Sequence, residues 1–214
     1  MDEEIQIINE NTRREKFKNF ITKYKKILIG SSSAFVLIIF LFFLYSDFKH
    51  KNQLKIADKF NEITTSYDNK KNENIVQDLT SIIYKKDKKY SPLALNFLID
   101  NKIVNDKEKI NKFFDIIINE IKHEKEIKNL ITYKQALYNA ESSTENNLLK
   151  ILNPILNSDS IWKSHSLYLM AEYFYSKNEK EKSKEFLNRI IELDNPNPNI
   201  KIEAQKRIRR DFSD

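Results

Sequence analysis

The sequence contains no cysteine, and among its 214 residues there is a single glycine, Gly30. Without cysteine the chain can form neither disulfide bonds nor thiolate metal sites, although this does not decide the compartment. Without further glycines it has no glycine-rich loop to cradle a phosphate and no GxSxG nucleophile turn. These absences exclude several common classes of enzyme.

Histidine is also scarce. His50, His123 and His165 stand far apart, and no pair of them has HExxH or another metal-ligand spacing. We expect all three to be ordinary surface or helix-edge residues. No grouping of a nucleophile with an acid and a base is recognisable elsewhere in the chain. The sequence therefore predicts that the protein is not an enzyme, with no catalytic, cofactor-binding or metal residues, no cofactor and no small-molecule substrate.

Basic residues exceed acidic ones by six, but the excess is not concentrated anywhere. Residues 1–26, 27–200 and 201–214 each carry a net charge of +2. A nucleic-acid-binding protein normally presents a continuous basic surface, so we expect no nucleic-acid partner. The short basic cluster KRIRR at 206–210 is interpreted as the polar outer face of a terminal helix, with anionic lipid or an acidic partner as the alternative.

One uncharged run, Ile27–Tyr45, stands out in a chain of which 32% is charged. As a helix, a run of this length rises about 1.5 Å per residue and covers roughly the 30 Å hydrocarbon core of a bilayer. The run is longer than the core of a cleaved signal peptide, and it ends in bulky residues where the peptidase needs small ones. We therefore predict a retained transmembrane signal-anchor helix in the lipid bilayer, with its ends at Ile27 and Tyr45.

The direction of this span follows from the lysines and arginines that flank it. Seven basic residues lie between positions 13 and 26, against four between positions 49 and 59. The bias predicts a cytosolic N-terminal tail at 1–26 and an outer domain at 46–214. The tail either docks a cytosolic partner or only sets the topology, and the second interpretation is favoured.

Residues after the span are predicted to be helical, because no period-two alternation is long enough for a strand and glycine is absent. Helix starts are expected at Ser91–Pro92 and at three pairs with capping-box spacing, Asn105/Glu108, Ser142/Glu145 and Asn178/Glu181. The predicted helices are 48–67, 74–86, 92–104, 106–123, 126–141, 143–157, 161–177, 179–193 and 198–211.

A shift of the sequence by 73 residues superposes Phe113 on Phe186 and Ile117 on Ile190. Seventy-three is about twice the 34-residue period of a tetratricopeptide helix pair, so another pair should lie between the two. Candidate core positions of this third pair are Tyr133, Ala136, Leu137 and Ala140, then Leu149, Leu152 and Leu156; those of a first pair are Ala57 and Phe60, then Ile75, Leu79, Ile82 and Ile83.

The last pair fits the tetratricopeptide pattern best, since small Ala171 and Ser183 would let its two helices approach closely. We predict an all-α chain with one N-terminal transmembrane helix. It is followed by a tetratricopeptide-like α-solenoid of about four degenerate helical hairpins plus a capping helix. Trp162 is expected to pack between hairpins, although it could anchor a partner. Glu124 and Glu126 are expected on solvated helix faces.

The N-terminal residues Asp2-Glu3-Glu4, Arg13-Arg14-Glu15 and Lys23-Tyr24, followed by the single span and the helical pairs, carry a family resemblance. In this layout the chain resembles the YfgM-like family of ancillary Sec translocon subunits, of the alphaproteobacterial type. The resemblance implies an inner-membrane protein with a periplasmic helical-repeat domain. It also implies that the partners are Sec translocon subunits and periplasmic chaperones.

Taken together, these features predict a membrane-anchored protein-interaction scaffold that links secreted polypeptides to chaperones. Stacked hairpins offer an extended binding surface, and tethering raises the effective concentration of weak partners. One alternative is a regulatory membrane anchor that acts through its cytosolic tail. Another is a scaffold for envelope assembly or cell division.

Overall fold

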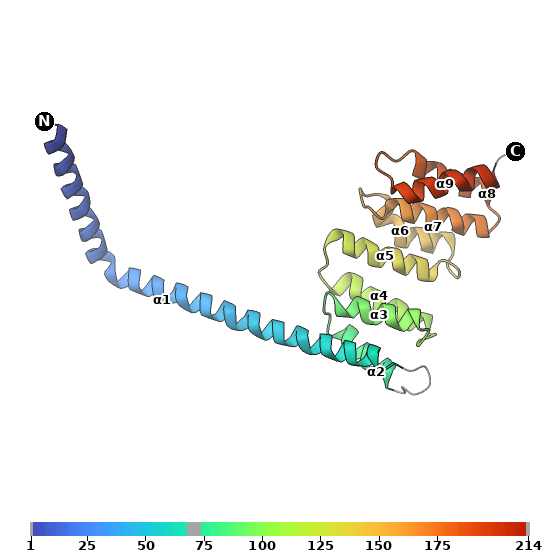
Figure 1. The fold of residues 1–214 in the computed structure, drawn as a ribbon, viewed down its shortest axis with the longest axis horizontal. Coiled ribbons are helices and arrows are strands. Elements are labelled where there is room, and N and C mark those ends of the chain that lie inside the picture. Colours follow the sequence, from blue (N-terminus) through green and yellow to red (C-terminus); the bar gives the residue numbers. More distant parts are fainter. Residues whose placement is uncertain (1, 68–73, 213–214) are drawn as a thin grey trace. The chain divides into compact units, whose positions relative to one another are not determined.

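The computed structural model describes residues 2–67 and 74–212, without the side chains of residues 2–12, Leu28 and Ser32. The described chain is helical, with no strand, and it divides into two compact units, Met1–Lys55 and Ile56–Asp214 (Figure 1). The predicted all-helical class is therefore confirmed. Of the predicted regions, Met1, residues 68–73 and residues 213–214 lie outside the described residues, as do the side chains of Asp2, Glu3 and Glu4.

Helix α1, Asp2–Thr65, makes up the described part of the first unit and continues into the second. The predicted helix at 48–67 is thus not a separate element. The sequence explains this continuity, because no proline or glycine lies between Gly30 and Pro92 to interrupt the hydrogen-bond ladder. The boundary between the units, Lys55–Ile56, falls ten residues beyond the predicted end of the span at Tyr45.

The second unit contains the end of α1 and a series of shorter helices whose predicted ends agree with the structure to within four residues. Their existence and order are therefore confirmed. They are α2 (Ile75–Tyr84), α3 (Tyr90–Asp100), α4 (Lys107–Glu120), α5 (Lys125–Asn139), α6 (Glu145–Leu156), α7 (Lys163–Ser176), α8 (Lys180–Ile191) and α9 (Pro198–Asp211).

Helices α4 and α6 are capped one and two residues later than expected. Asp106 caps α4, since its side chain accepts a hydrogen bond from the backbone N–H of Lys109 at 3.0 Å. Thr144 caps α6 in the same way, at 3.4 Å from the N–H of Asn147. A carboxylate also suits the positive end of the helix dipole at α4. The expected caps Asn105, Ser142 and Asn178 are therefore wrong, and Asn178 has instead a left-handed φ of 61°.

Ser91 was expected to cap α3 but lies inside the helix. Its side chain is buried, and its Oγ donates to the carbonyl oxygen of Ile82 at 3.1 Å, which ties α3 to α2. The start of α3 is held by Asp87, whose Oδ1 accepts hydrogen bonds from the backbone N–H groups of Lys89 and Tyr90. Ser91 thus joins α3 to α2, and Asp87 instead of Ser91 binds the free backbone N–H groups at the start of α3.

Within the second unit each helix from α2 to α9 packs against the next one in sequence, and the helices are stacked in chain order (Figure 1). Further contacts join α2 to α4, α5 to α7, and α7 to α9. The closest pair is α7 and α8, where the Ser183 Oγ donates to the carbonyl oxygen of Ala171 at 2.8 Å. Both residues are buried, so the expected close approach at two small side chains is confirmed.

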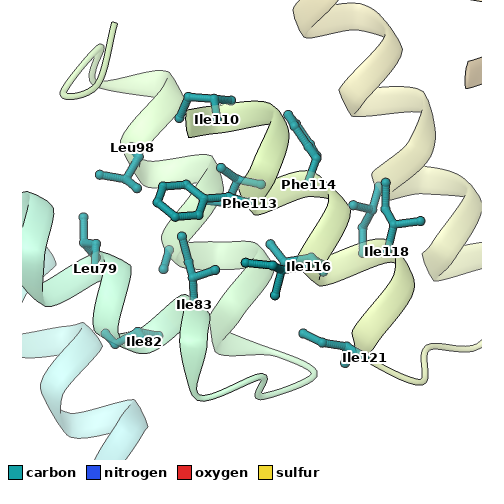
Figure 2. Close-up of a cluster of buried hydrophobic side chains, with 14 of the residues drawn as sticks. Leu79, Ile82, Ile83, Leu98, Ile110, Phe113, Phe114, Ile116, Ile118 and Ile121 are labelled. Atoms are coloured by element: carbon teal, nitrogen blue, oxygen red, sulfur yellow. The ribbon is translucent and has the colours of Figure 1, made fainter. Parts of the chain in front are cut away.

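The core of this unit consists of two apolar clusters. The first joins the end of α1 to α2, α3 and α4 and reaches Ile131 of α5, and the second joins α5 to α9. Neighbouring phenylalanines of α4 point to opposite partners (Figure 2): Phe113 contacts Tyr84 of α2, and Phe114 contacts Tyr138 of α5. Burying such a ring stabilises the fold by roughly 1.5–3 kcal/mol, so α4 is a main link in the stack.

Fully buried positions recur on α4, α6 and α8 with one common register. Residues 110, 114 and 117 correspond to 148, 152 and 155 after a shift of 38, and to 183, 187 and 190 after a further shift of 35. The two shifts add up to the 73 residues seen in the sequence. All these residues are 1% exposed or less: Ile110, Phe114, Ile117, Leu148, Leu152, Ile155, Ser183, Leu187 and Ile190.

Most predicted packing positions of the third pair are confirmed, since Ala136, Leu152 and Leu156 are buried and Tyr133, Ala140 and Leu149 pack partly buried against the second cluster. The exception is Leu137. Leu137 is 52% exposed, whereas the buried residues of α5 include Thr132, Ala136 and Asn139. On α6, Leu148 is buried beside the partly buried Leu149. Asn139 can be buried on α5 because its amide exchanges hydrogen bonds with Asn111 of α4, and its Nδ2 also donates to the carbonyl oxygen of Gln135.

Candidate functional site

The two predicted span ends, Ile27 and Tyr45, both lie on α1 within the first unit, with exposed side chains. The helical stretch Ile29–Thr65 contains a window of mean hydropathy 2.1, none of which is buried in protein. A Cβ added at Gly30 would likewise meet no atom of another element within 4 Å. Helix α1 is therefore long and apolar enough to cross a membrane.

In the second unit, a groove of about 620 Å³ runs between α3 and α5, with α4 beneath it. We call it the α3–α5 groove. Phe114 of α4 and Ile131 of α5 form its buried floor. Leu93 of α3 and Ile127 of α5 line its walls and remain 38% and 44% exposed. Exposed apolar side chains in a concave position are typical of binding sites.

The rim of the α3–α5 groove is basic. Lys88 and Lys89 stand on the α3 side and Lys134 on the α5 side, with Glu124 as the single carboxylate. In the part of the chain that the structure describes, none of these three lysines forms an ion pair. Lys89 lies over the ring of Tyr90, with its Nζ 5.2 Å from the centroid. No carboxylate of the described residues therefore neutralises the charges on the rim in an ion pair.

His123 also lines this groove. Burial is the main cause that lowers the pKa of His123, and the positive charges of Lys88 and Lys128 lower it further. A hydrogen bond with the backbone of Ile117 acts in the opposite direction. At neutral pH the imidazole is therefore uncharged, and the net charge of +2 on the groove comes from its lysines and Glu124.

A second groove, of about 690 Å³, lies across α4, α5 and α6 and is lined mainly by amide and hydroxyl side chains. Four of its polar side chains bond to one another. Asn111 and Asn139 exchange hydrogen bonds, and Gln135 donates to Asp115 at 3.3 Å. These bonds join α4 to α5. We call this site the polar groove; in its lining the Nδ2 of Asn129 is buried without a hydrogen-bond partner among the described residues.

The start of α7 gathers several residues that the sequence singled out. Trp162 stacks on Tyr133 of α5, with ring centroids 5.9 Å apart, and His165 lies against both rings. The prediction that Trp162 packs between hairpins is confirmed. His165 is half-buried in the first turn of α7, and burial lowers its pKa, against the opposing effect of a hydrogen bond with the backbone of Ile161.

Glu126 was expected on a solvated face, but it fixes the start of α7. Its Oε2 accepts a hydrogen bond from the Ser160 Oγ at 2.7 Å and another from the backbone N–H of Ile161 at 3.2 Å. The carboxylate therefore connects the first turn of α5 to the loop before α7. The expectation of a solvated carboxylate is wrong for Glu126.

Within the basic cluster KRIRR, Arg207 is 16% exposed and forms ion pairs with Glu172 at 2.7 Å and Asp211 at 3.0 Å. Its guanidinium also lies over the ring of Tyr175, 4.6 Å from the centroid. Arg210 pairs with Asp211 as well, and this bond lowers the pKa of that carboxyl. These contacts hold α9 against α7, so the interpretation of KRIRR as a polar outer face is wrong for Arg207, whereas Lys206, Arg209 and Arg210 are exposed.

Among the described residues no group of three or more histidine, aspartate or glutamate side chains is placed to hold a metal ion. No family model, curated protein or solved structure matches the chain. The α3–α5 groove is thus the candidate functional site. Sequence reasoning missed it, because Ile127 and Ile131, four residues apart, show an apolar face of α5 but not that this face stays open.

Proposed function

We propose that the protein is a membrane-anchored protein-interaction scaffold. Helix α1 is its anchor, and the second unit is a tetratricopeptide-like α-solenoid whose surface binds other proteins. The observation that carries this proposal is the common register of buried positions on α4, α6 and α8. Such recurrence is the mark of stacked helical repeats, and repeat folds act mainly as extended binding surfaces.

The anchor is supported by the side chains of α1. In a soluble protein a helix this apolar would be buried against other helices, but here residues such as Phe35, Ile38 and Leu41 are exposed within their own unit. Lipid is the solvent that suits such a surface. The span is assigned to Ile27–Tyr45, the uncharged part of the helix.

Closure of the stack supports the solenoid. Repeat arrays need terminal elements with a polar outer face, because each repeat buries its apolar face against its neighbours. Helix α9 fits this role, since it packs on α7 and α8, buries Ala204 and pairs Arg207 with Glu172 of α7, while Glu203, Lys206, Arg209 and Arg210 are exposed. About four hairpins with a closing helix account for the helices from the end of α1 to α9.

The flanking basic residues favour a cytosolic tail and a periplasmic repeat unit. Together with the resemblance to YfgM-like proteins, this orientation suggests an ancillary role beside the Sec translocon, where the unit would pass secreted polypeptides to chaperones. The retained anchor would hold weak binding surfaces close to the emerging chain.

Topology is the first test, and the absence of cysteine makes it direct. Glu141 lies exposed in the turn between α5 and α6 and is replaced by cysteine, and spheroplasts are treated with a membrane-impermeant maleimide. We expect labelling without lysis. Labelling only after lysis would place the repeat unit in the cytosol and would remove the translocon proposal.

Partner binding is tested separately by photocrosslinking in cells. Photoreactive residues are placed at several exposed positions of the second unit, among them Ile127, Lys150 and Ile202. We expect translocon or chaperone proteins to be captured at one or more of these positions. If the protein crosslinks only to itself or to lipid at every position, it is not a scaffold.

A further inference from the structure

The α3–α5 groove is left open by the described residues of the protein, although its surface is largely apolar. Leu93 of α3 and Ile127 of α5 line it with exposed side chains, and the buried Phe114 and Ile131 belong to the same lining. Covering these side chains would be favourable, since each Å² of apolar surface removed from water stabilises by about 25 cal/mol. An apolar group from another molecule would therefore be favoured here.

The α5 wall of this groove is extended by an extra turn. The buried residues Ser91, Asn129 and Ser164 occupy equivalent positions on α3, α5 and α7, at the same shifts of 38 and 35 as in the other helices. Helices α3 and α7 begin one residue before these positions, but α5 begins four residues before, at Lys125. The three additional residues 125–127 bring Ile127 into the groove.

The extra turn is fixed rather than frayed, because Glu126 within it binds the Ser160 hydroxyl and the backbone of Ile161. Ile127 therefore keeps its place without help from a ligand. A preorganised apolar side chain loses little entropy when a partner covers it.

The rim determines the charge of the partner. Lys88, Lys89 and Lys134 surround the apolar floor, form no ion pair among the described residues, and outnumber Glu124. Lys86, in the same loop as Lys88, is in contrast paired with Glu120 at 2.6 Å. Complementary charge steers association and rejects partners of the same sign.

We propose that the α3–α5 groove binds a short segment of a partner protein in which apolar side chains alternate with aspartate or glutamate. The apolar side chains would cover Leu93 and Ile127, and the carboxylates would meet Lys88, Lys89 and Lys134. This site rests on the proposed scaffold function and specifies the kind of partner that the scaffold accepts. An apolar floor of this kind does not suit a nucleic acid, which would need a longer basic surface.

The test uses the full-length protein in lipid nanodiscs and a phage library of random dodecapeptides, after depletion on empty nanodiscs. We expect the selected peptides to contain more acidic than basic residues together with leucine, isoleucine or phenylalanine. The selected pool is then measured against two groove variants, Lys134→Glu and Ile127→Ser. Each should reduce recovery at least about tenfold, which corresponds to the loss of one close charge pair or one apolar anchor.

Two matched variants control for charge and for general loss of apolar surface. Lys150→Glu makes the same charge change in the polar groove, and Ile202→Ser removes an exposed isoleucine on α9. Both should retain the pool. Basic or purely polar selected peptides, equal recovery on groove and control variants, or no enrichment over empty nanodiscs would each overturn the proposed site.

The photocrosslinking experiment separates this site from the scaffold function itself. If partner proteins are captured at Lys150 or Ile202 but never at Ile127, the scaffold stands and the groove is not its binding site. Capture at Ile127 that disappears in the Lys134→Glu variant, with captured segments rich in acidic and apolar residues, supports both. If no partner protein is captured at any position, both the scaffold function and the groove site are wrong.

Discussion

Asn111 of α4 and Asn139 of α5 exchange two amide hydrogen bonds, with N···O distances of 2.9 and 2.7 Å. Asn139 is buried and its Nδ2 also donates to the backbone of Gln135. The pair lies 28 residues apart in sequence, and it allows a polar side chain to occupy a core position between two helices.

This pair predicts a coupled effect on stability. Replacing either asparagine by alanine leaves the amide of the other without its partner, which should cost about 1–3 kcal/mol of unfolding free energy. Replacing both by leucine should cost less than the sum of the two single changes. Urea unfolding followed by the fluorescence of Trp162, the single tryptophan, measures all variants. Strictly additive single and double effects would show that the two amides do not depend on each other.

The close contact at Ser183 predicts that a larger side chain at this position would push α7 and α8 apart. Its equivalents in register are Ile110 and Leu148, but its Oγ lies 2.8 Å from the Ala171 carbonyl oxygen and leaves no room for a larger group. Ser183→Leu should therefore lower the free energy of unfolding by about 1–3 kcal/mol or more through overpacking.

Ser183→Ala is the control for this change, since it removes the hydrogen bond and keeps the space, and it should cost only about 1 kcal/mol. The same urea titration compares the two. Equal stability of the leucine and alanine variants would mean that α7 and α8 can separate freely, contrary to the close approach described above.

Much of the fold could be predicted from the sequence, because helix periodicity and the apolar run are local signals. The order of the helices and the apolar stretch of α1 follow from them, whereas the continuation of α1 through the predicted separate helix 48–67 was not predicted. The burial of Asn139 and the exposure of Leu137 could not be predicted, since Asn139 is bonded to Asn111 of another helix. A partner so distant in sequence leaves no local pattern.

The candidate site was hidden for a related reason. Nothing near Ile127 in the sequence tells whether its side chain packs or remains open, because this depends on how far α3 stands from α5. The role of Glu126 is equally non-local, as its hydrogen-bond partners are at 160 and 161. The predicted N-caps of α4 and α6 were wrong by one and two residues, because several adjacent polar residues can each act as an N-cap.

The two histidines of the second unit predict a stability that decreases below neutral pH. Burial lowers the pKa of both His123 and His165 in the folded protein. As the pH falls through the ordinary histidine range, near 6.5, the unfolded chain takes up protons before the folded one does. The unfolded state is thus favoured increasingly between about pH 7.5 and 5.5, and above this window neither histidine contributes.

We expect the melting temperature of the second unit to decrease by a few degrees between these pH values. The double variant His123→Gln/His165→Gln should show a smaller decrease, whereas His50→Gln, on exposed α1, should behave as the natural protein does. Thermal melts in nanodiscs, followed by Trp162 fluorescence, give the comparison. A flat pH profile for the natural protein would rule out the shifted histidines as a source of acid sensitivity.

The membrane anchor predicts a position-dependent effect of charge on α1. Ile38 and Leu41 lie in the middle of the uncharged run Ile27–Tyr45, and one arginine at the centre of a span costs about 2.5–3.5 kcal/mol of insertion free energy. The double variant Ile38→Arg/Leu41→Arg should therefore move a large part of the protein from the membrane pellet to the soluble or aggregated fraction after carbonate extraction. Phe48→Arg/Leu54→Arg introduces the same charges on the same helix outside the run and should stay in the membrane. Equal retention of both double variants would mean that the run does not cross the bilayer.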